Sequence, residues 1–187
     1  MASSSSFSSV SFVLLSAILV AEVAGASVDP TFPMCKTVGG GGPYFDVQFC
    51  MAALSPHSGD VKNYQDAAAV AVDLLTANAT STSAKIGGLL RGGGGGGGNG
   101  GDGATAGCLR SCQALYGGIV QRQPGCLAAV KAGKLDEAKQ SLETSAGAAK
   151  QCEDGFGESG VASPVTAEDD NAFKLAKLAV ALIGFAY

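Results

Sequence analysis

The sequence lacks tryptophan, has a single histidine, and carries few charged residues for its length. Its 187 residues include 12 Lys and Arg against 16 Asp and Glu, which gives a net charge of −4. Nucleic-acid and anionic-membrane surfaces both need clustered positive charge, and no group of Lys or Arg forms a basic patch here. We therefore predict no nucleic-acid partner, and no membrane partner once the N-terminal segment described below is removed.

The scarcity of histidine also limits the chemistry that the chain could perform. His57 lies in the loop sequence Ser-Pro-His-Ser, with no obvious acid to complete a Ser-His-Asp triad. Cys108 and Cys112 are four residues apart and could share a zinc ion, together with Cys126 and Cys152. These cysteines are better explained as members of an apolar helix stripe. We predict that the chain is not an enzyme and has no metal or other cofactor.

The first 26 residues are typical of a secretory signal peptide. Residues 10–20 are an apolar run, and Ala-Gly-Ala at residues 24–26 is a small-residue cleavage site. A buried N-terminal helix is the alternative interpretation. Export would leave one domain of residues 27–187, with all six cysteines in an oxidising compartment. In that compartment the sequon Asn-Ala-Thr makes Asn78 a candidate N-glycosylation site.

Residues 27–57 contain four prolines, a run of four glycines, and too few apolar residues for a core of their own. Cys35 and Cys50 bracket the glycines. A disulfide between them would remove about 3 kcal/mol of chain entropy from the unfolded state. We expect a short strapped hairpin that lies on the main body. Six cysteines allow fifteen connectivities, so the count alone does not fix the pairing.

From residue 60 onward, apolar residues recur every three or four positions, as they do in amphipathic helices. We predict a first helix that begins with Asp60 as its N-cap. A flexible glycine-rich linker is expected at residues 92–103. Its seven consecutive glycines are not a phosphate-binding loop, because no strand precedes them and no Lys-Ser/Thr pair follows.

The next stretch predicts a helical hairpin with arms at residues 104–132 and 135–155. Gly133 lies between the arms, where a helix commonly ends on glycine. Cys112 falls on the inner face of the first arm and Cys152 on the inner face of the second. The two cysteines are therefore placed to form a disulfide.

Two further cysteines, Cys108 and Cys126, lie on the same stripe as Cys112. On one helix their 18-residue separation spans about 27 Å. A disulfide needs Cα atoms within about 7 Å, so these two cannot pair with each other. We predict that both are free thiols.

The last helix is expected from about residue 167 towards the C terminus. Thr166 followed by Asp169 resembles a capping box at its start. Residues 178–187 are uncharged but too few to cross a bilayer, which needs about 20 residues. Short links favour antiparallel neighbours, so the predicted fold is all-α: an up-and-down four-helix bundle over residues 60–187, preceded by the hairpin at residues 27–57.

Short motifs in a fixed order add to this interpretation. They are Cys-Lys-Thr at residues 35–37, Asp-Val-Gln-Phe-Cys at 46–50, Cys112 with Tyr116, Asp-Glu-Ala at 136–138, and Cys-Glu-Asp-Gly-Phe at 152–156. On these motifs the mature chain resembles the plant family of invertase and pectin methylesterase inhibitors over almost its whole length. The resemblance implies a disulfide-strapped N-terminal helical hairpin, a four-helix bundle, and the disulfides Cys35–Cys50 and Cys112–Cys152.

The resemblance also implies a function. Members bind near 1:1 over the active site of a secreted carbohydrate-processing enzyme, in the cell wall (apoplast) or in the vacuole. The target is pectin methylesterase or acid invertase. Invertase inhibitors often carry Pro-Lys-Phe at the turn before the third bundle helix, where this chain has Gly-Lys-Leu at residues 133–135. Pectin methylesterase is therefore the favoured target, with acid invertase as the alternative.

We expect the contact surface on the exposed side of the second and third bundle helices. The residues chosen for it are Lys134, Asp136, Glu137, Gln140 and Thr144. The alternative is that these side chains only face solvent. A small secreted storage or ligand-carrying helical protein is the competing class. Such proteins usually carry Cys-Cys and Cys-x-Cys pairs, and this sequence has neither.

Overall fold

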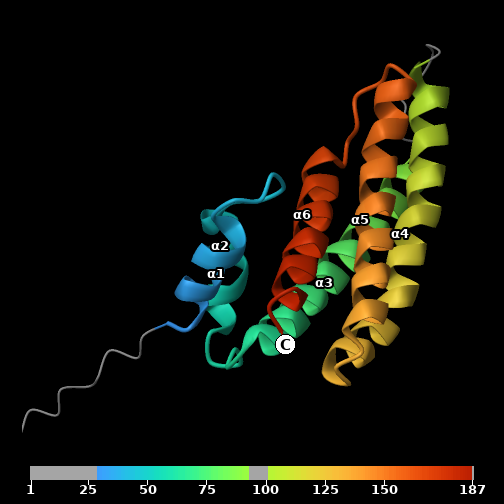
Figure 1. The fold of residues 1–187 in the computed structure, drawn as a ribbon. Coiled ribbons are helices and arrows are strands. Elements are labelled where there is room, and N and C mark those ends of the chain that lie inside the picture. The colour runs from blue at the N-terminus through green and yellow to red at the C-terminus, as the bar shows by residue number, and fades with distance from the viewer. Residues whose placement is uncertain (1–28, 93–100, 187) are drawn as a thin grey trace, which may run out of the picture.

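A computed structural model describes residues 29–92 and 101–186 (Figure 1). All regular structure in these two ranges is helical, which confirms the predicted all-α class. The helices are α1 (Thr31–Gly39), α2 (Val47–Leu54), the short 3-10 helix η1 (Ser55–His57), α3 (Tyr64–Arg91), α4 (Gly101–Lys131), α5 (Leu135–Glu158) and α6 (Thr166–Ile183). The predicted signal peptide, residues 1–26, lies outside the described residues.

The four long helices form the bundle. Each packs against two neighbours in the closed order α3, α4, α5, α6, so the predicted four-helix bundle is confirmed (Figure 1). Large side chains that are fully buried fill its axis, among them Leu75, Ile86, Leu109, Ile119, Leu142, Leu178 and Leu182. Burying each such side chain contributes about 1.5–3 kcal/mol. Buried alanines on α3, α5 and α6 allow the helices to approach closely.

The N-terminal hairpin consists of α1 and α2, which lie beside α6 and away from α4 and α5 (Figure 1). The disulfide Cys35–Cys50 joins them, with a Cα–Cα distance of 5.4 Å and both residues fully buried. A Cβ atom on Gly39 would lie 2.8 Å from the Val47 nitrogen, so this close approach requires glycine. The residues predicted as a strapped hairpin are thus helical.

Aromatic contacts attach the hairpin to the bundle. The ring of Tyr44, in the loop between α1 and α2, packs edge-on against Phe173 of α6 with centroids 5.6 Å apart. The Lys177 ammonium lies 4.7 Å from the centroid of the Tyr44 ring. A cation over an aromatic face contributes about 0.5–1 kcal/mol at an exposed site.

Two predicted helix caps are wrong. Asp60 does not cap α3; the Asn63 side chain does, accepting a hydrogen bond of 2.9 Å from the Asp66 amide. Residue 60 instead belongs to a turn in which its amide bonds to the His57 carbonyl. At α6 the N-cap is Val165, without a side-chain bond, so the predicted capping box of Thr166 and Asp169 does not form.

The predicted linker at residues 92–103 is also too long. Gly92 caps α3, and α4 already begins at Gly101, so the last three residues of the predicted linker are helical. Adding a residue to a formed helix gains one hydrogen bond, which opposes the cost of about 1 kcal/mol for glycine. Residues 93–100 lie outside the described ranges.

The disulfide Cys112–Cys152 joins α4 to α5, with Cα atoms 4.9 Å apart and each residue 1% exposed. Both bridges have the pairing that the family resemblance implies. Cys108 and Cys126 are free thiols; Cys126 is buried, and Cys108 is half-buried with its Sγ 3.3 Å from the Gly155 carbonyl oxygen. In the described part of the chain, no helix is both long and apolar enough to cross a membrane.

The α4–α5 bridge should make a large contribution to stability. We expect the double variant Cys112→Ser/Cys152→Ser to lose about 4 kcal/mol of unfolding free energy, because the bridge closes a loop of 40 residues in the unfolded chain. Urea denaturation followed by circular dichroism measures this loss. Cys108→Ser is the matched control and should change stability by less than about 1 kcal/mol. An equally stable double variant would contradict the assignment.

Candidate enzyme-binding surface

The five residues predicted to bind a target lie together in the structure. Lys134 ends the α4–α5 turn, and the other four follow on the first three turns of α5; all five are exposed. We call this surface, made of Lys134, Asp136, Glu137, Gln140 and Thr144, the α5 ridge. Its two acids lie in the first turn of α5, where the helix dipole favours negative charge. The sequence alone therefore identified a continuous exposed surface.

The turn that precedes the α5 ridge has a fixed backbone. Gly133 adopts a φ of 70°, in the left-handed region, as glycine at a helix end commonly does. The Gly133 amide bonds to the Val130 carbonyl at 3.1 Å, and the Lys134 amide bonds to the Ala129 carbonyl at 2.9 Å. This pair of bonds is a Schellman motif, and it sets the direction in which α5 leaves α4.

Hydrogen bonds between helices hold the α4 end of this turn and the body of α5. The Gln65 side chain of α3 donates a hydrogen bond of 2.6 Å to the Val130 carbonyl, near the last turn of α4. Below the ridge, the buried Gln123 of α4 donates to the Ser145 hydroxyl of α5 at 3.1 Å. The inward side chains of α5, Ala138, Leu142, Ala146 and Ala149, are buried. The ridge is therefore pre-organised, which lowers the entropy lost on binding a partner.

Few interactions within the chain engage the polar groups of the ridge. The Lys134 ammonium and the Glu137 carboxylate are 3.7 Å apart, with their side chains 62% and 67% exposed. An exposed pair of this kind contributes 0–1 kcal/mol, so both charges remain available to a partner. The Thr144 hydroxyl donates to the Gln140 carbonyl in its own helix, at 2.8 Å.

A polar cluster that the sequence did not reveal lies in the cleft between α5 and α6. The Tyr116 hydroxyl of α4 donates a hydrogen bond of 2.5 Å to Asp169, which is only 2% exposed. Glu153 of α5 lines the same cleft. Burial raises the pKa of Asp169 to about 7; Tyr116 opposes the rise, and the Glu153 carboxyl adds to it. Asp169 precedes the buried Ala172 by three residues, and that spacing was the available sign that it points inward.

Two other residues singled out in the sequence lie away from the ridge. Asn78 is in the middle of α3, partly buried, and lines a groove between α2, α3 and α6 together with Phe49 and Asn171. His57 ends η1 and lines a shallow cleft with Asp60 and Asp66. Among the residues that the structure describes, no group of three or more His, Cys, Asp or Glu side chains could hold a metal ion.

The geometry of the α4–α5 turn gives a testable pair of glycine substitutions. Gly133→Ala should cost about 1–2 kcal/mol, because a Cβ atom is strained in the left-handed region. Gly147→Ala, on the outer face of α5 with open space around it, should instead stabilise the helix by about 0.5–1 kcal/mol. Thermal unfolding of both variants measures the two effects. The same sign at both positions would contradict this description of the turn.

Comparison with known proteins agrees with the fold. The family model of plant invertase/pectin methylesterase inhibitors matches residues 34–182. A crystal structure of a mutant form of a pectin methylesterase inhibitor from Arabidopsis superposes with a TM-score of 0.64 at 18% identity, covering 75% of this chain and 90% of that one. A pectin methylesterase inhibitor from Arabidopsis thaliana gives a TM-score of 0.59 at 18% identity, covering 84% and 95%.

A comparison with curated protein sequences gave no significant match. The two structural similarities have low identity and bear on the fold, whereas the family match spans most of the sequence. The chain belongs to the plant invertase/pectin methylesterase inhibitor family.

Proposed function

We propose that this protein is a secreted inhibitor that binds a pectin methylesterase of the plant cell wall near 1:1 and covers its active site. The family match over residues 34–182 is the observation that carries the proposal. The two similar solved structures are described as pectin methylesterase inhibitors, and they support this choice of target. The proposal assigns no catalytic step to the chain.

The form of the molecule suits an inhibitor that acts by binding alone. Two buried disulfides and a closed ring of four helices hold the surface in one conformation before any partner arrives. The α5 ridge is polar and exposed, and it begins at a turn whose backbone is fixed by two hydrogen bonds. We place the contact with the enzyme on this ridge, with its acids and Lys134 as the charged groups that meet the partner.

Location in the cell wall is part of the same proposal. The N-terminal residues 1–26 would direct export and be removed, and the oxidising compartment would maintain both disulfides. Asn78 would then be available for N-glycosylation during export. Deposition in the vacuole is the alternative destination.

Inhibition assays test the target directly. Folded mature protein, residues 27–187, should abolish the activity of a plant pectin methylesterase at a molar ratio near one. The same amount should leave an acid invertase active. Residual activity of each enzyme, titrated against the inhibitor, measures this. Inhibition of the invertase alone would replace the proposed target, and inhibition of neither enzyme would contradict the proposed function.

Charge reversal tests the proposed contact surface. Glu137→Lys should weaken inhibition at least about tenfold, because it places a repulsive charge where the partner is matched to an acid. Asp73→Lys is the matched control: residue 73 is also an exposed acid, but on α3, across the bundle from α5. Inhibition constants and melting temperatures are measured for both. Equal inhibition by the two variants would show that the enzyme does not contact the α5 ridge.

A further inference from the structure

A pair of carboxyl groups lies across the seam between α5 and α6. Asp169 of α6 is 2% exposed, and its Oδ1 atom accepts the hydrogen bond from Tyr116. Its other oxygen, Oδ2, is buried and has no hydrogen-bond partner among the described residues. The same is true of Oε2 of Glu153 on α5. Both residues line the same cleft between α5 and α6, and the Glu153 carboxyl adds to the rise in the pKa of Asp169.

Two ionised carboxylates in this position would repel each other at low dielectric, and each would have an unsatisfied buried oxygen. One proton between them removes both penalties, since the protonated carboxyl donates to its neighbour. We propose that Asp169 and Glu153 form a proton-binding site that joins α5 to α6 in acid and opens as the pH rises towards neutrality. This inference concerns the folding equilibrium and does not depend on which enzyme the protein binds.

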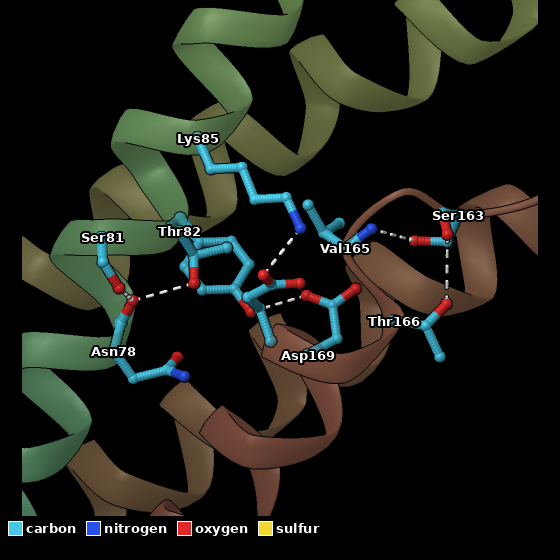
Figure 2. A network of polar contacts seen from close by, with 10 residues as sticks. Asn78, Ser81, Thr82, Lys85, Ser163, Val165, Thr166 and Asp169 are labelled. Carbon is cyan, nitrogen blue, oxygen red and sulfur yellow. Dashed lines mark hydrogen bonds and ion pairs between the residues drawn. The ribbon is translucent and has the colours of Figure 1, made fainter.

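The other two oxygens of the pair already accept hydrogen bonds, so a shared proton would serve Oδ2 of Asp169 and Oε2 of Glu153. The Tyr116 hydroxyl donates a hydrogen bond to Oδ1 of Asp169. Burial raises the pKa of this phenol, so it remains protonated and keeps its role as a donor. The Thr166 hydroxyl donates to Oε1 of Glu153 at 2.8 Å. Figure 2 shows Asp169 and Thr166 on the same segment, near the start of α6, with the carboxyl of Asp169 directed between the helices.

The cations near the pair are already paired with other acids. On α3, Lys85 bonds to Glu168 at 2.7 Å, and this lowers the pKa of Glu168. On α5, Lys150 bonds to Asp154 at 2.7 Å.

The third cation near the carboxyl pair, Lys174 of α6, is also paired, and it bonds to Asp170 at 2.6 Å. The acids facing Asp169 from its own helix and from α5 therefore add negative potential, while α4 contributes the neutral Tyr116. Protonation is the available means of neutralising the pair.

Solvent can reach the pair without unfolding of the bundle. Asp169 and Glu153 line a cleft of about 420 Å³ between α5 and α6, together with Thr166 and Phe173. Protons can therefore exchange in the native state. Two carboxyls and one hydroxyl are too few ligands for a metal, and within residues 29–92 and 101–186 no larger acidic group could hold one.

The direction of the pH effect follows from linkage. Burial raises the pKa of Asp169 to about 7 in the folded protein, whereas an unfolded Asp has a pKa near 4. A raised pKa means that the folded state holds the proton more tightly. The stabilisation is complete below about pH 4 and is lost as the pH rises through about 7. Between these values the unfolding equilibrium constant should increase about tenfold per pH unit.

Urea denaturation between about pH 5 and pH 8 tests the proposal. Wild type should lose stability steadily over this range, with the loss levelling off above about pH 7. Asp169→Asn keeps the shape of the side chain and supplies a permanent donor to Glu153, so its stability should be flat over the same range. Glu153→Gln should move the wild-type loss to lower pH. Asp73→Asn, at an exposed acid on α3 outside this cleft, is the control and should keep the wild-type profile.

A titration of the wild type needs no variant. The ¹³C carboxyl resonance of Asp169 should titrate with a midpoint near 7, and a midpoint near 4 would overturn the proposal. The proposal would also be overturned if the stability of Asp169→Asn depended on pH in the same way as that of wild type. Calcium chloride at neutral pH should leave the stability of wild type unchanged. Stabilisation of wild type by calcium, absent from Asp169→Asn, would show a cation site in place of the proton site.

Discussion

The close packing of α4 against α5 is the constraint on which the rest of the structure depends. At the Cys112–Cys152 bridge the two backbones approach to a Cα–Cα distance of 4.9 Å, and small residues line much of the seam. The Schellman turn at Gly133 closes the lower end of the pair and leaves α5 with one buried face and one exposed face. The α5 ridge lies at the start of the exposed face. An inhibitor that acts only by binding needs such a surface to be rigid, and the α4–α5 pair supplies that rigidity.

The α5–α6 seam is held in a different way. One group of its polar contacts is centred on Asp169, which accepts a hydrogen bond from Tyr116 of α4 and shares a cleft with Glu153 of α5. The stabilisation from a disulfide does not depend on a proton, whereas the stabilisation from a carboxyl pair changes with pH. The bundle thus combines one permanent seam with one that depends on protonation. We regard the second seam as the place where the surroundings of the protein influence its stability, and the first as the support of the proposed binding surface.

Much of this architecture could be predicted from the sequence, because it follows from local spacing. The regular recurrence of Leu135, Ala138, Leu142 and Ala146 predicts α5 and its buried face, and Gly133 predicts the turn before it. The start of α3 could not be predicted, since Asp60 and Asn63 are equally good caps and the turn after η1 decides between them. The role of Asp169 was missed for a related reason. An acid in the first turn of a helix normally faces solvent, and this expectation outweighs the three-residue spacing to Ala172; the partner of the buried carboxyl, Tyr116, is 53 residues away in the sequence.

The central claim is that the α5 ridge meets the active-site region of a pectin methylesterase. Site-specific photo-crosslinking tests it most directly. With a photoreactive residue at position 140 of the inhibitor, illumination of the mixture should give a covalent adduct, and mass spectrometry should place the crosslink beside the catalytic cleft of the enzyme. The same residue at position 73, on α3, should give none. An adduct from position 73 and none from position 140 would contradict the account.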